Sequence, residues 1–219
     1  MQMSIAATPT LAPQPIPRRR RFLRPVATAL AGRAESLAGA LLDLSGHAEA
    51  TAAVAAALVE TVRGGGKVLV AGNGGSAAEA QHFATEMIGR FRRERAPIAA
   101  LALTADTAIL TAVGNDYGYA EIFARQVRGL ARPGDLLLLF STSGESDNLV
   151  QAAIAARERG VTVAAITGGR ASRLGDLADL VIFAPSGDTP LVQEIHVVLL
   201  HLLCDIVEAE MVRDQERGR

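Results

Sequence analysis

Lys67-Val68-Leu69-Val70-Ala71 runs directly into Gly72-Asn73-Gly74-Gly75-Ser76, and this stretch decides the fold. A short apolar run that ends in a glycine-rich turn before a helical pattern indicates a strand–loop–helix unit. The spacing is neither that of a Gly-x-Gly-x-x-Gly dinucleotide site nor that of a nucleotide P-loop, which ends in Gly-Lys-Ser/Thr. The glycines would let the backbone approach a ligand closely, and the helix start offers N–H groups to an anion. A tight turn capped by Ser76 is the alternative.

The same alternation of strand and helix continues along the chain. Two Ala- and Leu-rich helices are expected before the first strand, at 26–44 and 48–63, and a long amphipathic helix at 190–213 closes the chain. Such alternation forms a parallel sheet with helices on both faces. The sequence therefore predicts an α/β fold with a five-stranded parallel sheet flanked by helices. The strands are expected at 67–71, 98–103, 135–140, 161–166 and 180–183, and the intervening helices at 76–91, 107–113, 119–130, 147–159 and 172–177.

Length and composition exclude several classes of protein. The chain has 219 residues, of which 49% are hydrophobic and 21% charged, so it suits one generous domain and is not globally disordered. A net charge of -1 argues against nucleic acid as the main partner, and 4% aromatic residues argue against base-stacking surfaces. The single cysteine, Cys204, rules out an internal disulfide and a multi-cysteine zinc site. The longest apolar stretch, 191–207, contains charged residues, so we expect no contact with a membrane interior.

The N-terminus differs from the rest of the chain. Residues 1–25 contain five prolines and five arginines but no acidic residue. We expect residues 1–24 to form a disordered basic tail and residues 25–219 to form the domain. The run Arg19-Arg20-Arg21-Phe22-Leu23 resembles a twin-arginine export signal, but the apolar segment after it is too short for one. A cytoplasmic location is therefore expected.

A second loop with unusual chemistry follows the strand expected at 135–140. Ser141-Thr142-Ser143-Gly144-Glu145-Ser146 carries hydroxyl groups on most of its residues and precedes a helix. Hydroxyls and helix N–H groups together can hold a phosphate without Lys or Arg. The alternative, an ordinary helix cap, needs fewer hydroxyls, so the composition favours a phosphate site. A third loop is expected at Val113-Gly114-Asn115-Asp116-Tyr117-Gly118, which by itself is only a turn signal.

Two helices carry side chains that could bind a metal ion. His82 and Glu86 stand at positions i and i+4, and so share one face of the helix after the first loop. Gln193 and His201 lie a little over two turns apart and share a side of the closing helix. The alternatives are a surface pair for His82 and Glu86, and a satisfied core histidine for His201. None of these patterns decides the question alone.

In combination, the motifs are specific. The sequence from about Val26 to Met211 resembles the sugar isomerase (SIS) domain family, and within it the phosphoheptose isomerases. The resemblance implies a single SIS domain that forms a homotetramer. The motifs that carry it are Gly-Asn-Gly-Gly-Ser at 72–76, Gln81-His82-Phe83 with Glu86, Gly-Asn-Asp-Tyr-Gly at 114–118, Ser-Thr-Ser-Gly-Glu-Ser at 141–146, and Gln193-Glu194-Ile195-His196 followed by His201.

The resemblance also implies roles for individual residues. Glu86 and His201 would be the general base and the general acid. One zinc ion per subunit would be bound by His82, Glu86, Gln193 and His201. The substrate would be contacted by Asn73, Gly74, Gly75, Ser76, Glu86, Asn115, Asp116, Ser141, Thr142, Ser143, Ser146 and Gln193.

The implied reaction is the isomerisation of sedoheptulose 7-phosphate to glycero-manno-heptose 7-phosphate through an enediol, the first step of nucleotide-activated heptose synthesis. It needs a base, an acid and stabilisation of the enediolate, to which zinc would contribute as a Lewis acid. The rival interpretation is a non-catalytic tetrameric SIS scaffold that binds a replication initiator. That relative's pattern lacks a histidine at position 201 and has arginine at position 143, whereas this chain has His201 and Ser143. An isomerase for another sugar phosphate is a further alternative.

Overall fold

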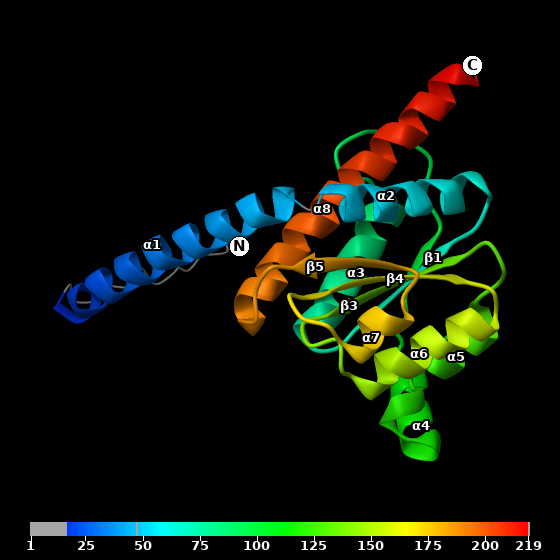
Figure 1. The fold of residues 1–219 in the computed structure, drawn as a ribbon, viewed down its shortest axis with the longest axis horizontal. Helices are drawn as coiled ribbons and strands as arrows, with labels where there is room; N and C mark the ends of the chain where they lie inside the picture. Colours follow the sequence, from blue (N-terminus) through cyan, green and yellow to red (C-terminus); the bar gives the residue numbers. More distant parts are fainter. Residues whose placement is uncertain (1–16, 47, 219) are drawn as a thin grey trace, which may run out of the picture. The chain divides into compact units, whose positions relative to one another are not determined.

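Five parallel strands form the sheet in this computed structural model, which describes residues 17–46 and 48–218. Strands β1 and β3 are buried along their whole length, because helices cover both faces, and their continuous runs of Val and Leu reflect this. The predicted α/β fold and five-stranded parallel sheet are confirmed. The order in the sheet is β2 (Ala100–Ala102), β1 (Val68–Gly72), β3 (Leu136–Ser141), β4 (Thr162–Gly168) and β5 (Leu180–Ala184). Figure 1 shows helices on both sides of this sheet.

Helices alternate with the strands as predicted, and a long helix closes the chain. Asp106, Ser172 and Asp188 each accept a backbone N–H from the first turn of the helix that follows them, which stabilises the helix start. The helices are α1 (Pro17–Ser45), α2 (Ala48–Arg63), α3 (Gly75–Ile88), α4 (Thr107–Tyr117), the short 3-10 helix η1 (Tyr119–Glu121), α5 (Ala124–Leu130), α6 (Asp147–Glu158), α7 (Arg173–Leu177) and α8 (Thr189–Arg217).

The chain divides into two compact units, Met1–Ser36 and Leu37–Arg219. In the first unit α1 begins at Pro17 instead of residue 26, because proline suits the first helical turn and arginine is a good helix former. Residues 17–24 are therefore helical and not disordered, while the remainder of the predicted tail, residues 1–16, lies outside the described residues. In the second unit, α1 packs against the core from Leu37 onward.

One predicted turn is helical in the structure. Helix α4 continues through Gly114, Asn115 and Asp116, and the turn follows at Gly118, whose φ of 87° favours glycine. Leu110 and Val113 pack against the core from this helix. Their packing outweighs the turn preference of the Gly-Asn-Asp sequence, as tertiary contacts often do.

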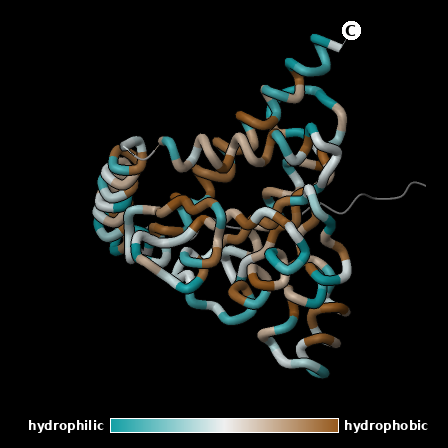
Figure 2. The backbone as a smooth tube through the Cα atoms, turned by 45° about the vertical axis from the view of Figure 1, so that its right-hand side comes forward, coloured by the Kyte–Doolittle hydropathy of each residue, from teal (hydrophilic) through white to brown (hydrophobic). Residues whose placement is uncertain are grey.

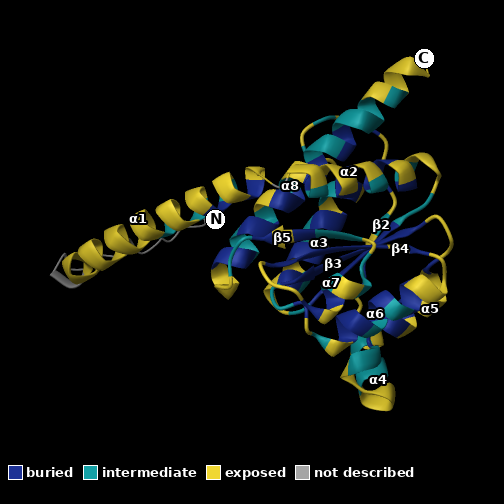
Figure 3. Cartoon of the chain, viewed as in Figure 1, coloured by how far each residue is buried: buried dark blue, intermediate teal, exposed yellow. Residues whose placement is uncertain are grey.

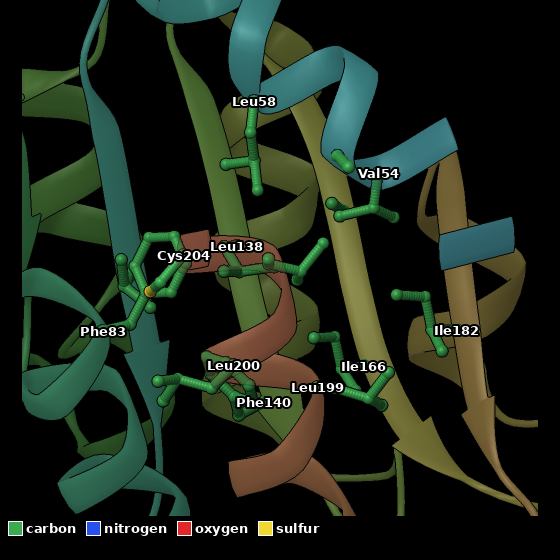
Figure 4. Packing of buried hydrophobic residues seen from close by; sticks show 14 of the residues in the cluster. Val54, Leu58, Phe83, Leu138, Phe140, Ile166, Ile182, Leu199, Leu200 and Cys204 are labelled. Carbon is green, nitrogen blue, oxygen red and sulfur yellow. The ribbon is translucent and has the colours of Figure 1, made fainter. Parts of the chain in front are cut away.

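Two apolar layers enclose the sheet. On one face, α2, α3 and α8 pack against the strands through side chains such as Leu58, Phe83, Leu138 and Leu199 (Figure 4). On the other face, α5 and α6 supply a second cluster around Phe123. The central strands β1, β3 and β4 are accordingly buried, while the outer faces of the helices are exposed (Figure 3). Helix α8 becomes hydrophilic towards the C-terminus (Figure 2), and none of the helices described is apolar over enough residues to cross a membrane.

The strand order determines where a ligand can bind. Strand β2 lies on one side of β1 and β3 on the other, so the direction of winding reverses between β1 and β3. In such sheets ligands bind at the carboxyl ends of the strands, at the point of reversal. Gly72 at the end of β1 is in register with Phe140 near the end of β3. The loops that follow these strands, the glycine loop and the serine-rich loop, therefore begin side by side.

A buried carboxylate joins the amino ends of β1 and β3, at the end of the strands opposite the two loops. Asp135, just before β3, accepts the backbone N–H groups of Lys67 at 2.9 Å and Arg132 at 2.8 Å, and pairs with the Lys67 ammonium at 2.5 Å. Burial raises the pKa of the Asp135 carboxyl, but the bonds from Lys67 and Arg132 outweigh this effect, and the net pKa lies below its usual value. The ionised form thus fastens the start of β1 to the start of β3.

We predict that Asp135→Asn makes the protein less stable at neutral pH but not in acid. A carboxyl whose pKa is lowered on folding stabilises the fold above its unfolded pKa of about 3.9, and loses that effect as the pH falls through its folded pKa. The substitution should cost about 1–3 kcal/mol of unfolding free energy at pH 7, as measured by urea titration. The cost should shrink below about pH 4; an equal cost at both pH values would contradict the assignment.

Candidate active site

A pair of asparagines joins the loop after β1 to the helix after β3. The Asn73 amide donates to Asn148 Oδ1 at 2.8 Å, and the Asn148 amide donates back to Asn73 Oδ1 at 2.8 Å. The Tyr119 hydroxyl also donates to Asn73 Oδ1, at 3.1 Å. These bonds fix the two loops against each other at the crevice that the strand order predicts.

The serine-rich loop keeps part of its polar surface unused. Ser141 Oγ accepts the Gly144 N–H at 3.0 Å, and Ser143 Oγ accepts the Glu145 N–H at 3.2 Å. Ser146 is the N-cap residue of α6, but its side chain makes no capping bond. The simple capping interpretation therefore does not account for Ser146, and the start of α6 has the character of an anion site. Beside it, a polar pocket of about 110 Å³ is lined by Thr142, Ser143, Gly169, Arg170, Ser186, Gly187 and Thr189.

Gly144 gives the serine-rich loop its shape. Its φ is +67°, a conformation that side chains rarely adopt, and a Cβ atom there would lie 2.1 Å from Ser172 Oγ. Ser172 Oγ in turn accepts the Gly175 N–H at the start of α7. A larger residue at position 144 would disturb both the loop and this cap.

Helices α3 and α8 bring three candidate catalytic side chains together. His82 Nε2 lies 3.1 Å from Glu86 Oε1, along one face of α3. His201 Nε2 lies 3.4 Å from the same His82 nitrogen, across from α8, and the two rings meet edge to face with centroids 5.0 Å apart. The sequence-predicted set His82, Glu86 and His201 is thus one contiguous cluster.

The hydrogen-bonding roles in the cluster depend on which imidazole nitrogens carry hydrogens. A neutral imidazole carries one hydrogen on one of its two nitrogens. If His82 Nε2 is protonated, that single hydrogen faces both Glu86 and His201. If it is not, its lone pair points at the Glu86 carboxylate. A shared cation would instead be bound by lone pairs of these side chains. The separations of 3.1 and 3.4 Å are similar to those between atoms that ligate one zinc ion at about 2.0–2.2 Å.

Gln193 lies near the same cluster because position 75 has no side chain. A Cβ atom on Gly75 would lie 2.3 Å from Gln193 Nε2, so only glycine lets this amide approach the start of α3. An open pocket of about 420 Å³ here is lined by both Gln193 and His82. Larger hollows beside β5 and β2, of about 470 and 560 Å³, are lined by no His, Asp or Glu side chain of the part of the chain that the structure describes, so chemistry and not size identifies the site.

The donor types suit zinc, although the geometry is not that of a complete metal site. Imidazole nitrogen and carboxylate oxygen are common zinc ligands. Within residues 17–46 and 48–218, no three His, Cys, Asp or Glu side chains enclose a single ion position. Burial raises the pKa of the Cys204 thiol well above its ordinary value, so a thiolate does not compete. His82 therefore forms one donor pair with Glu86 and a second with His201.

Comparison with known proteins gives the family. Residues 35–168 match the SIS domain family. The chain is 50% identical over 161 residues to the phosphoheptose isomerase of Bradyrhizobium sp. (strain BTAi1), a match that covers 74% of this chain and 81% of that protein. It is 51% identical over 157 residues to the phosphoheptose isomerase of Geobacter metallireducens, with 72% and 83% covered. The chain belongs to the phosphoheptose isomerase family of SIS-domain proteins.

A solved structure supports the same assignment. The phosphoheptose isomerase from Francisella tularensis is similar with a TM-score of 0.80 and 38% sequence identity, and the match covers 84% of this chain and 98% of that one. Membership in the phosphoheptose isomerases confirms the predicted SIS domain and the enzyme interpretation over the scaffold.

Some residues predicted for the phosphoheptose isomerase site do not join it in the single chain. Ser76 is 3% exposed and packs against Gly72 on β1, where an added Cβ would meet it at 2.9 Å. Asn115 and Asp116 are exposed on α4, and the Asn115 amide donates to Asp116 Oδ1 at 2.8 Å. Within the described residues, neither has a hydrogen bond or ion pair to His82, Glu86 or His201.

Other polar residues belong to the isomerase site but were not indicated by the motifs. Asn148 lies two residues beyond the serine-rich loop and holds Asn73. Glu79 lines the pocket between α3 and α8, and its carboxylate lies 3.2 Å from Nδ1 of the buried His196. Glu79 is three residues before His82, so the helical spacing in the sequence indicates that the two side chains are neighbours on α3. The partner of Asn148 is distant in sequence, and no local pattern reveals it.

Proposed function

We propose that this phosphoheptose isomerase family member converts sedoheptulose 7-phosphate into glycero-manno-heptose 7-phosphate. Relatives at about half sequence identity carry the name phosphoheptose isomerase. The observation that carries the proposal is the juxtaposition of Glu86 and His201 through His82, at 3.1 and 3.4 Å. An aldose–ketose isomerisation requires such a base and acid within reach of one sugar.

The reaction moves one carbon-bound proton and one oxygen-bound proton. Glu86 removes the proton from C1 of the ketose, while His201 supplies a proton to the carbonyl oxygen at C2, which gives the enediol. Glu86, whose proton exchanges with solvent while the enediol exists, then delivers a proton to C2, and His201 recovers a proton from the oxygen at C1. Both residues end as they began, and the sugar has become the aldose.

The serine-rich loop supports binding of the far end of the sugar. Its free Ser146 hydroxyl and the start of α6 suit a phosphate, and Thr142 and Ser143 line the polar pocket next to it. Asn73, fixed by Asn148, lies between this loop and the α3 helix and would contact the sugar. Gly74 and Gly75 leave the backbone open to it.

We further propose one zinc ion per subunit, held by His82, Glu86, Gln193 and His201. The short separations of the donor atoms of His82 from those of Glu86 and His201, 3.1 and 3.4 Å, support this. When bound, zinc would polarise the oxygens at C1 and C2 of the sugar as a Lewis acid. These side chains would hold the ion in place, and Glu86 would also remove the carbon-bound proton.

The proposal includes a homotetramer in the cytoplasm. Several large apolar side chains are exposed on the single chain, among them Leu30 at 67% and Leu42 at 74% on α1, and Leu202 at 44% on α8. Symmetric association would cover such side chains. Light scattering of the purified protein should give the mass of four chains; a stable monomer at micromolar concentration would contradict the tetramer.

Glu86→Gln tests the assignment of the base. The amide keeps the shape of the side chain but cannot accept the proton, so kcat for sedoheptulose 7-phosphate should fall about 100-fold or more. His201→Gln should cause a comparable loss. Glu94→Gln, at a carboxyl whose side chain is 90% exposed, is the matched control and should keep wild-type turnover. A folded Glu86→Gln protein with wild-type turnover would exclude Glu86 as the base.

Metal removal tests the zinc proposal. Chelation should abolish most of the turnover, zinc alone should restore it, and elemental analysis should find close to one zinc per chain after restoration. His82→Gln should lower this zinc content, because it removes the central donor of the cluster. Full turnover by protein verified as metal-free would refute the proposal.

A further inference from the structure

A single buried carboxylate holds the loop between α3 and β2. Glu208 on α8 is fully buried, and it accepts the backbone N–H groups of Phe91 at 2.9 Å, Arg92 at 2.8 Å and Arg93 at 2.8 Å. Burial raises the pKa of the Glu208 carboxyl, but these backbone bonds outweigh it and the net pKa lies below its usual value. Glu208 is therefore ionised and binds the loop directly to α8.

A buried arginine ties the same carboxylate to the end of α3. Arg95 Nε lies 3.6 Å from Glu208 Oε1, and both side chains are 1% exposed. The other guanidinium nitrogens donate to the carbonyl of Glu86 at 2.7 Å and to that of Ala96 at 3.0 Å. Carbonyls in the last turn of a helix have no helical partner, so Arg95 caps α3 at the residue that carries the proposed base.

The loop also reaches the proposed acid. The Phe91 ring stacks on the His201 ring, with centroids 5.2 Å apart and planes 24° from parallel. Glu208 lies seven residues after His201, two turns along the same side of α8. The carboxylate thus fixes the backbone of Phe91, and the ring of Phe91 covers one face of the imidazole.

We propose that Glu208 and Arg95 are positioning residues for the isomerisation, acting on His201 through Phe91 and on Glu86 through the carbonyl cap. This rests on the proposed function, since Glu86 and His201 are its base and acid. Neither positioning residue touches the sugar. Their buried ion pair sets the orientation of two side chains that come from different helices and must act on neighbouring carbons.

A merely structural ion pair would behave differently, and Asp135 provides the comparison. Asp135 is also a buried carboxylate that accepts backbone N–H groups and pairs with a cation, but its bonds go to Lys67 and Arg132 and not to Phe91, α3 or α8. Loss of either carboxylate lowers stability. Of the two carboxylates only Glu208 bonds the backbone of Phe91, so only its loss should move His201.

The test compares Glu208→Gln, Phe91→Leu and Asp135→Asn in the full chain, each at a temperature where the variant is folded. Misplacement of a catalytic group by about 1 Å can cost up to about 100-fold in rate. We expect kcat for sedoheptulose 7-phosphate to fall roughly 10- to 100-fold in the first two variants, with KM changed by less than about threefold. Asp135→Asn should keep kcat within about twofold. The double variant Glu208→Gln/Phe91→Leu should fall no further than the single ones, because both act through one contact.

A second readout does not depend on activity. The His201 ring protons, assigned by their loss in His201→Gln, should shift in the NMR spectrum of Glu208→Gln in the same direction as in Phe91→Leu, and stay in place in Asp135→Asn. Phe91→Leu keeps the backbone N–H groups, so it carries the test if Glu208→Gln does not fold. Wild-type kcat in folded Phe91→Leu, or unmoved His201 resonances in both variants, would overturn the proposal. An inactive wild-type protein with the expected NMR shifts would instead refute the proposed function alone.

Discussion

The packing of α3 against α8 is the contact on which the rest of the site depends. It brings His82 and Glu86 from one helix to His201 on the other, and it places Gln193 over Gly75. Phe83 on α3 and Leu200 on α8 lie in the same apolar layer, which covers one face of the sheet. The hydrophobic contact therefore fixes the positions of the polar residues on the two helices relative to each other. On each helix, the polar side chains of the site and the apolar side chains of the core have a fixed spacing.

Polar groups fix the loops beside the apolar layer. The Asn73–Asn148 pair locks the two loops at the strand ends, and the Glu208 carboxylate locks the loop beside His201. The Glu208 carboxylate is fully buried and Asn73 is partly buried, and hydrogen bonds of 2.8 to 2.9 Å to both make the loops that they hold rigid. In an isomerase, rigidity of this kind has a chemical use, since the same two side chains must serve two adjacent carbons without a change of position.

The sequence predicted the parts of the molecule that local patterns encode. The continuous apolar run at 135–140 marked a central strand, and the spacing of His82 and Glu86 marked a shared helix face. The turn expected at Gly114 was wrong because Leu110 and Val113 anchor α4 to the core, a tertiary effect that the local pattern does not contain. Glu208, Phe91 and Asn148 were not predicted, because their partners lie far away in the sequence. The resemblance to SIS proteins supplied the roles of Glu86 and His201, which spacing alone left open.

The central claim is that this site moves a proton between neighbouring carbons of sedoheptulose 7-phosphate by way of an enediol. It is tested most directly by incubating the purified full-length protein with this sugar in D₂O and following the products by NMR. A base that exchanges its proton with solvent while the enediol exists should leave deuterium at C2 of the heptose 7-phosphate that forms. Conversion into the aldose with deuterium at C2 is the predicted result. An unchanged sugar, or an aldose that stays free of deuterium at C2 even after repeated turnover at equilibrium, would contradict the account.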